Sequence, residues 1–332
     1  MRRWMRGIAI ALACFVALVA LAFGWASLQP PSHPRWGATF SPTYARFLGL
    51  DPHEAFRAVV ADLGAKAIRL PLYWDSIEKA PGQDDWSGTD WYVHAAEQEG
   101  VKLTLVIGAR VPRWPECHIP AWAQGDADAR DRALMAYLQA AVERYKGSPA
   151  VERWQVENEP GFTLFGECPS LSHDLLRREV LLVHSLDTRP VQLTTSGEIQ
   201  PWFPIERLAD VLGTSVYRTV WNRYLGYLTY PFPPAFYRLR AIGARLFAGK
   251  VIISELQAEP WFPDSGVSKP ITDDARLFTA DDLKANAKFA EDTGLPEAYF
   301  WGVEWWYALK KAGDPRLWNA GKAIFQQNQT AP

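Results

Sequence analysis

Short apolar segments alternate regularly with amphipathic segments along most of this chain. Eight segments rich in aliphatic and β-branched residues each precede helical or loop sequence. The predicted strands are residues 36–41, 66–72, 101–108, 151–156, 191–195, 211–216, 250–254 and 298–303. Strand followed by helix, repeated eight times over about 290 residues, predicts an α/β fold, a parallel (β/α)8 TIM barrel.

Helical periodicity fills the intervals between these strands. In residues 128–145, for example, Leu134, Leu138 and Val142 fall on one helical face. The predicted helices are 51–63, 88–99, 128–145, 170–187, a short one at 204–210, 234–248, 280–292 and 315–327. A doubly wound open sheet is the alternative, but no glycine-rich phosphate turn follows the first strand. Without a repeat or a second domain, residues 36–328 are predicted to form one barrel.

The first 28 residues have the pattern of a targeting segment. Arg2, Arg3 and Arg6 precede 22 uncharged residues, from 7 to 28. This run is long enough for a membrane-spanning helix, and the positive flank predicts a cytoplasmic N-terminus. We favour an uncleaved anchor over a cleaved signal, although small-residue cleavage patterns end at Ala22 and Ala26. In either case residues 29–35 form a linker, the barrel is extracytoplasmic, and the membrane is a partner through this segment.

The net charge excludes one class of binding partner, and the cysteines indicate the cellular compartment. Net charge is −2, the pI is near 6.3, and no basic stripe follows residue 6, which argues against a nucleic-acid partner. Beyond Cys14, only Cys117 and Cys168 remain. In an oxidising compartment these two are expected to form a disulfide, the alternative being two unpaired thiols in separate loops.

Acidic residues gather where two predicted strands end. Glu157 and Glu159 follow the fourth strand, and Glu255 ends the seventh, with Glu259 just beyond. In a barrel these ends meet at the face where active sites form. Paired carboxylates suit cleavage of a glycosidic bond, because one protonates the departing oxygen while the other attacks or activates water. The alternative interpretation is a set of ion pairs that closes the barrel mouth.

These motifs resemble the clan A glycoside hydrolases, the retaining barrels that include family 5 cellulases and mannanases. Asn158-Glu159-Pro160 ends the fourth strand, and Ser254-Glu255 ends the seventh, 96 residues later for the two glutamates. The resemblance implies that Glu159 is the acid/base, that Glu255 is the nucleophile, and that Asn158 bonds the sugar 2-hydroxyl.

The resemblance extends to three further residues. It implies that Arg69 on the second strand and Tyr217 after the sixth strand orient the nucleophile. It also implies that the ring of Trp301 on the eighth strand packs against the sugar at the cleavage point. Trp74 and Glu259 are additional substrate-binding candidates. The histidines usual in family 5 near the third or fourth strand and before the strand-6 tyrosine are missing, which leaves the family within the clan open.

Aromatic residues are frequent in the predicted loops, and the chain holds 16 Trp. Indole faces suit the C–H faces of sugar rings, so two or three of these loop residues are expected to form sugar platforms. The candidates are Trp114, Trp122, Trp202, Trp221, Trp261 and Trp305. The aromatic loop 224–230 either lines the cleft or lies on the membrane surface.

The six histidines neither cluster nor end a strand, so no metal or cofactor is expected, and no histidine partners a serine for a Ser/His/Asp hydrolase. Two functions remain. The first is a retaining glycoside hydrolase that acts on a poly- or oligosaccharide, with a transglycosylase as a variant. The second is a non-catalytic glycan-binding or scaffolding barrel in surface-polysaccharide metabolism.

Overall fold

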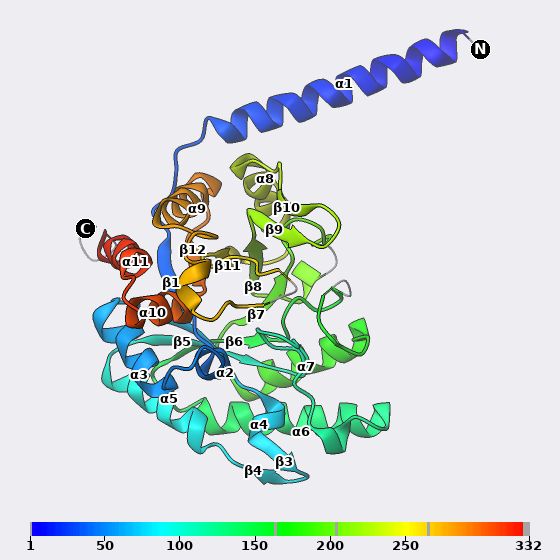
Figure 1. Cartoon of the computed structure of the whole chain (residues 1–332). Coiled ribbons are helices and arrows are strands. Elements are labelled where there is room, and N and C mark those ends of the chain that lie inside the picture. Colours follow the sequence, from blue (N-terminus) through cyan, green and yellow to red (C-terminus); the bar gives the residue numbers. More distant parts are fainter. Residues whose placement is uncertain (1, 163–164, 203–204, 264–265, 328–332) are drawn as a thin grey trace.

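The computed structural model describes residues 2–162, 165–202, 205–263 and 266–327 and contains a closed parallel barrel surrounded by helices (Figure 1). The barrel strands are β1 (Arg35–Thr39), β2 (Ala67–Pro71), β5 (Lys102–Ile107), β6 (Val151–Val156), β7 (Val191–Thr195), β8 (Val211–Val216), β11 (Lys250–Gln257) and β12 (Glu297–Trp301). Each pairs in parallel with its neighbours in this order, and β12 closes on β1. The predicted TIM barrel is confirmed.

Helices lie outside the barrel, where the amphipathic pattern put them. They are α3 (Pro52–Arg57), continued by a π-helical turn over Ala58–Asp62, α5 (Ser87–Gln98), α6 (Ala127–Tyr145), α7 (His173–Leu186), α8 (Pro234–Ala244), α9 (Ala280–Thr293) and α11 (Arg316–Gln327). Local capping fixes several of these ends. Thr279 and Asp282 form a capping box at the start of α9, and Gly294 ends it at a φ of 72°.

Short elements between the strands differ from the sequence prediction. The predicted helix 204–210 is only a 3₁₀ turn at Ile205–Arg207, and residue 204 lies outside the described residues. The eighth strand stops at Trp301 because Gly302 turns the chain at a φ of 121°. Helices not foreseen are α2 (Pro42–Phe47), α4 (Trp74–Ile77) and α10 (Val303–Lys311).

Two hairpins extend the loops after strands. One joins β3 (Glu78–Ala80) to β4 (Gln83–Asp84). The other joins β9 (Thr219–Asn222) to β10 (Gly226–Thr229), so the aromatic segment expected to be a loop is an antiparallel hairpin that follows β8.

Ion pairs fill the amino-terminal end of the barrel. The Arg153 guanidinium lies 2.6 Å from carboxylate oxygens of both Glu152 and Glu297. Arg35 pairs with Glu152 at 2.8 Å, and Lys250 pairs with Glu297. Each carboxylate here therefore has two cationic partners, which offsets the cost of its burial.

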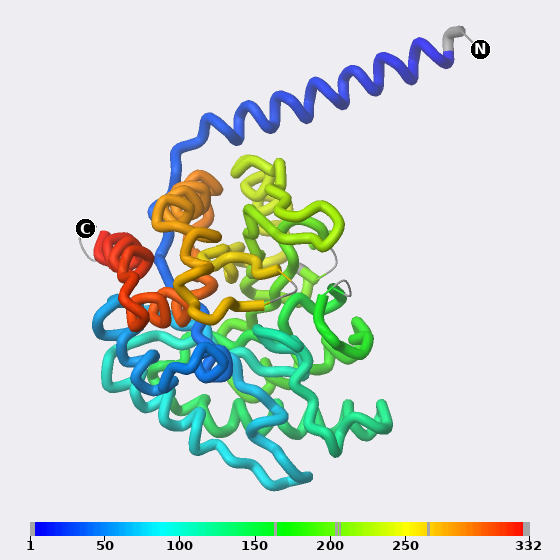
Figure 2. Tube along the Cα trace, in the orientation of Figure 1, coloured from blue at the N-terminus to red at the C-terminus, as the bar shows by residue number. Residues whose placement is uncertain are grey.

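The N-terminal segment forms one helix, α1 (Arg2–Ser27), which projects from the barrel (Figure 2). It is long and apolar enough to cross a membrane, as a signal or an anchor would be. Only its last turns contact the barrel, where Ala26 is buried and α1 meets α8. After the helix, Ser32 donates hydrogen bonds to the carbonyl oxygens of Glu291 and Leu295.

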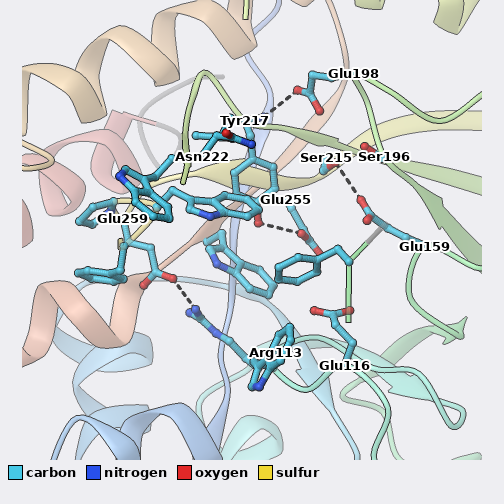
Figure 3. A pocket seen from close by; sticks show the side chains of 18 of the residues that line it. Arg113, Glu116, Glu159, Ser196, Glu198, Ser215, Tyr217, Asn222, Glu255 and Glu259 are labelled. Carbon is cyan, nitrogen blue, oxygen red and sulfur yellow. Dashed lines mark hydrogen bonds and ion pairs between the residues drawn. The ribbon is translucent and has the colours of Figure 1, made fainter. Parts of the chain in front are cut away.

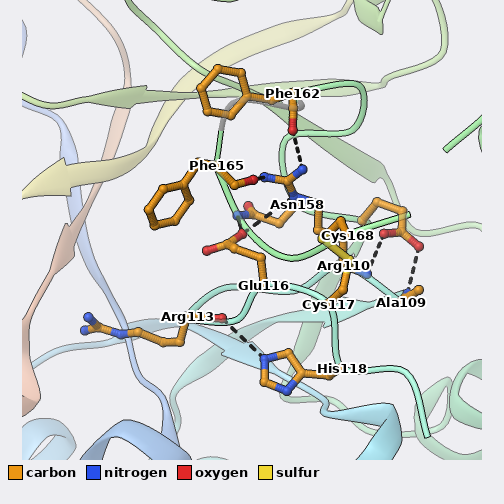
Figure 4. Close-up of a disulfide and its surroundings, with 11 residues drawn as sticks. Ala109, Arg110, Arg113, Glu116, Cys117, His118, Asn158, Phe162, Phe165 and Cys168 are labelled. Atoms are coloured by element: carbon orange, nitrogen blue, oxygen red, sulfur yellow. Dashed lines mark hydrogen bonds and ion pairs between the residues drawn. A yellow bond between two sulfur atoms is a disulfide. The ribbon is translucent and has the colours of Figure 1, made fainter. Parts of the chain in front are cut away.

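The predicted disulfide is present. Cys117 and Cys168 are joined with 5.2 Å between their Cα atoms, so the bond links the loop after β5 to the loop after β6 (Figure 4). Disulfides persist in oxidising compartments, and together with the apolar helix this bond agrees with an extracytoplasmic location.

Candidate active site

A cavity of about 720 Å³ opens at the carboxyl-terminal end of the barrel (Figure 3). It is lined by residues that end β6, β8, β11 and β12 and by the loops after them. Of the residues named from the sequence, it gathers Asn158, Glu159, Tyr217, Glu255, Glu259 and Trp301.

Glu255 has a cation and a phenol as direct partners. A register shift of β11 against β8 between Ile253 and Glu255 marks the place where the strand turns its carboxylate toward the cavity. Arg69, which is 1% exposed, donates to one carboxylate oxygen at 2.7 Å, and the Tyr217 hydroxyl donates to the other at 3.0 Å. Both contacts stabilise the ionised carboxylate and fix its direction.

Glu159 lies in a different electrostatic environment. Its backbone has a φ of 43°, which places a non-glycine residue in the sparsely populated left-handed region. Its N–H donates to the Thr194 hydroxyl at 2.8 Å, and the Ser215 hydroxyl donates to its carboxylate at 2.9 Å. Burial, followed by the nearby charges of Glu255 and Glu116, raises the pKa of Glu159 to about 8. Glu159 therefore holds a proton at neutral pH.

Asn158 joins these two groups to the loop after β5. Its side-chain oxygen accepts hydrogen bonds from Arg69 at 2.6 Å and from Thr194 at 3.1 Å. Its amide nitrogen donates to Glu116 at 3.0 Å. The amide is thereby held rigidly next to the carboxylate pair.

Glu116 is a cavity residue that the sequence analysis missed. It is 4% exposed, its backbone has a φ of 72°, and burial followed by the charge of Glu255 raises its pKa. Figure 4 shows it beside the disulfide and Asn158. Its neighbour Cys117 was the available signal, since a disulfide fixes the adjoining residue in the loop that borders the site.

Arg113 is a second cavity residue that the sequence analysis missed, and it lies on the side of the cavity formed by Glu259 and Trp301. Its guanidinium pairs with Glu259 and lies 3.3 Å from Glu304. It also stacks between two rings, 3.7 Å from the centroid of Tyr44 and 4.1 Å from that of Trp301. Burial opposes its charge, but Glu259 and Glu304 raise the pKa of Arg113, so it stays cationic. Trp301 thus lines the cavity with one ring face covered by Arg113.

Trp74 does not reach the cavity, which corrects its selection as a substrate-binding candidate. The side chain is fully buried in α4, stacks on Tyr137 and donates its indole N–H to Glu78 at 2.7 Å. The preceding Tyr73 is also buried, and its hydroxyl shares a hydrogen bond with the Ser41 hydroxyl at 2.6 Å. Neither residue lines the cavity.

Glu157 and Glu198 are buried carboxyls with structural partners. Glu157 accepts the backbone N–H groups of Ala109 and Arg110 at 2.8 and 2.7 Å, and burial raises its pKa to about 7. Glu198 accepts from the Tyr237 hydroxyl at 2.7 Å and from the Tyr217 N–H at 2.8 Å. Glu157 therefore fastens the loop after β5. Glu198 holds the backbone of Tyr217 and also lines the cavity (Figure 3).

The loop tryptophans divide into two groups. Trp114, Trp221 and Trp261 line the cavity together with Trp301, whereas Trp122, Trp202 and Trp305 pack elsewhere. No cluster of His, Cys, Asp or Glu that could hold a metal ion occurs among the described residues.

The chain is a (β/α)8 barrel, and it is similar to glycoside hydrolases, family 5 among them. No protein-family model matches the chain. Among curated proteins it is 29% identical over 134 residues to endo-1,4-beta-xylanase 3 of Hypocrea jecorina, covering 39% of this chain and 35% of that protein.

The chain is also 30% identical over 119 residues to mannan endo-1,4-beta-mannosidase A of Emericella nidulans, covering 32% of this chain and 30% of the relative. It thus matches about a third of the length of these relatives. Among solved structures, GH5_18 of Streptomyces cattleya in complex with GlcNAc aligns with a TM-score of 0.62 at 13% identity, covering 92% of this chain and 82% of that one. At this identity the likeness establishes the fold.

Proposed function

We propose that the chain is a retaining O-glycoside hydrolase that acts on a poly- or oligosaccharide. The observation that carries this proposal is that two carboxyl groups in one cavity have different electrostatic environments. Glu255 is paired with Arg69 and Tyr217, whereas burial and nearby carboxylates keep Glu159 protonated. One ionised and one protonated carboxyl are what the two steps of retaining hydrolysis require.

In the first step Glu255 attacks the anomeric carbon while Glu159 gives its proton to the departing oxygen. The glycosidic C–O bond breaks, the aglycone leaves with the proton, and a covalent glycosyl-enzyme forms on Glu255. Glu159 is then an anion and removes a proton from water. That water attacks the anomeric carbon, releases Glu255, and gives a product with the original configuration.

The remaining residues orient the reactants. Arg69 and Tyr217 aim Glu255, Asn158 borders the sugar 2-hydroxyl, and Trp301 and Glu259 contact the sugar from the opposite wall. Relatives named as a xylanase and as mannosidases favour a β-1,4-linked glycan. The exclusion of water from the acceptor side would decide between hydrolysis and transglycosylation.

The same proposal includes a location. Helix α1 anchors the barrel with its N-terminus in the cytoplasm, or it directs secretion and is cleaved. Its uncharged length and its basic flank support the anchor, and the disulfide agrees with either route.

The test is hydrolysis of a panel of β-glycans and aryl β-glycosides by the wild type and by Glu255→Ala, with Glu259→Gln as the matched carboxylate control. We expect Glu255→Ala to lose about 10⁴-fold or more in kcat/KM and Glu259→Gln to lose far less. An activated 2-fluoro glycoside should label a peptide that contains Glu255. Labelling at Glu259 would reject the assignment.

The alternative, a glycan-binding or scaffolding barrel, predicts a different result. It expects saturable binding of a glycan from the panel with no turnover by folded wild type. It also expects that binding to be unchanged in Glu255→Ala.

A further inference from the structure

Both walls of the cavity hold aromatic side chains, but most of the aliphatic ones lie on one wall. The wall built by β11, β12 and the loops after β1 and β5 carries Arg113 and Glu259 among aromatic rings. The wall built by the loops after β6, β7 and β8 carries polar groups such as Glu198 near its base, and it also carries five side chains without polar atoms, which are Phe162, Ile199, Val220, Leu225 and Leu228. We refer to these five residues as the apolar wall.

Several polar groups beside the apolar wall are hydrogen-bonded within the protein. Gln257 accepts the N–H groups of Arg218 and Thr219 at 2.9 Å and donates to the Thr219 carbonyl at 2.6 Å, which fixes the base of the β9–β10 hairpin. The side-chain oxygen of Asn222 accepts the Tyr224 N–H at 2.9 Å. Sugar hydroxyls need hydrogen-bond partners, and aliphatic side chains offer none.

The apolar wall lies on the side of the departing group. Glu159, the proposed acid, ends β6, and the Phe162 N–H donates to the Glu159 carbonyl oxygen at 3.0 Å. The acid must face the oxygen that leaves, so the aglycone lies against the loops of β6, β7 and β8. The chemistry of these loops therefore reports on the aglycone rather than on the sugar being cleaved.

The apolar wall continues to the surface beside α1. Leu225 is 73% exposed and Leu228 41%, and the hairpin leads directly into α8, against which the end of α1 packs. Ile242 near the end of α8, and Leu246 and Phe247 just after it, are exposed as well. Figure 1 shows α8 and the hairpin on the same side of the barrel as α1. Large exposed apolar side chains gathered on one side of a domain are typical of interaction surfaces.

From this arrangement we propose that the substrate is a membrane glycolipid, whose sugar binds at Glu159 and Glu255 and whose aliphatic chain lies along the apolar wall. The inference rests on the proposed glycosidase function and names its substrate class. A membrane-spanning α1 holds α8 and the hairpin at the lipid surface, so the chain of a glycolipid enters the cavity without crossing water. The bond cleaved is the one between the sugar and its lipid carrier.

The first experiment measures how activity depends on aglycone length. The full-length wild type, in a detergent without a sugar headgroup, receives methyl and octyl β-glucosides, β-mannosides and β-xylosides below their micelle concentrations. Each buried methylene favours binding by about fourfold, so kcat/KM for the cleaved sugar should be at least about 100-fold higher with the octyl chain. An octyl-to-methyl ratio within twofold, with aryl glycosides still cleaved, would overturn the inference and leave the proposed function intact.

The variant Leu225→Ser/Leu228→Ser should lower that ratio at least about tenfold. Leu181→Ser is the matched control, because Leu181 is 53% exposed on α7 and does not line the cavity. If no glycoside is cleaved, calorimetric binding of the same compounds decides. Octyl-dependent binding that the double variant loses would support the apolar site and reject only the hydrolase, whereas binding of equal strength for both chains would reject the inference.

A second arm separates a membrane lipid from a soluble apolar glycoside. A glycosyl diacylglycerol bearing the cleaved sugar is incorporated into phosphatidylcholine vesicles with the full-length chain. We expect release of the sugar, diminished in Leu225→Ser/Leu228→Ser. Cleavage of the octyl glycoside without cleavage of the vesicle lipid would overturn the membrane source.

Discussion

Both ends of the barrel contain buried glutamates and a buried arginine, but the two ends differ in how many of these glutamates form ion pairs. At the amino-terminal end, Glu297 has Arg153 and Lys250 as partners, so its charge is fully paired. At the carboxyl-terminal end, Glu255 has Arg69, but none of the described residues forms an ion pair with Glu159. Pairing stabilises a closed end, whereas a buried acid left without a cation keeps a proton that it can donate.

The largest loss of activity is expected for Glu159→Gln, which removes the proposed proton donor. With natural glycans, which have poor leaving groups, kcat/KM should fall about 10²- to 10⁴-fold because no group protonates the departing oxygen. Dinitrophenyl glycosides need no acid, so their glycosylation step should persist, and added azide should restore turnover. Equal rates for mutant and wild type on a natural glycan would reject Glu159 as the acid.

At the paired end the expected loss is in stability, not in catalysis. Arg153→Met leaves Glu297 buried with less compensation and should cost about 3–5 kcal/mol in the free energy of unfolding, measured by urea denaturation. The double variant Arg153→Met/Glu297→Leu should recover part of that loss, with kcat/KM within threefold of wild type below the unfolding range. A single-variant cost under about 1 kcal/mol would mean that the pairing contributes little.

The dependence of kcat/KM on pH tests whether Glu159 carries the required proton. Since Glu159 has a pKa raised to about 8, the proton required in the first step is present below that pH and lost above it. For substrates with poor leaving groups, kcat/KM should fall about tenfold per pH unit above 8. Dinitrophenyl glycosides should lack this basic limb, and a limb of equal steepness with them would assign it to another group.

The smallest effect is expected where both charges are in water. Asp174 and Arg178 on α7 lie 3.3 Å apart, with side chains 76% and 50% exposed. A double-mutant cycle with alanine should give a coupling of only about 0.3–0.5 kcal/mol, screened by added salt. A coupling above about 1 kcal/mol would show that pairing strength here does not follow burial.

Much of the site could be predicted because barrel strands end at one face. Once the strand order was known, Arg69, Asn158, Glu159 and Glu255 had to meet. The structure joins them in one hydrogen-bonded group, which Glu159 enters through the Thr194 hydroxyl. Their proposed roles still await the kinetic tests. Arg113 and Glu116 could not be predicted, since both sit in a loop at positive φ, 87° and 72°, that no local pattern encodes.

The barrel, its strand order, the apolar N-terminal helix and the acidic strand ends could be predicted from the sequence, because each depends on periodicity or spacing along the chain. Three features could not be predicted in this way: Trp74 faces the core, Arg113 covers Trp301, and residues 224–229 belong to a hairpin beside the cavity. These outcomes depend on side-chain direction and on loops from distant strands. Side-chain direction and loop position are both set by packing among residues far apart in the chain, and not by local conformational preference.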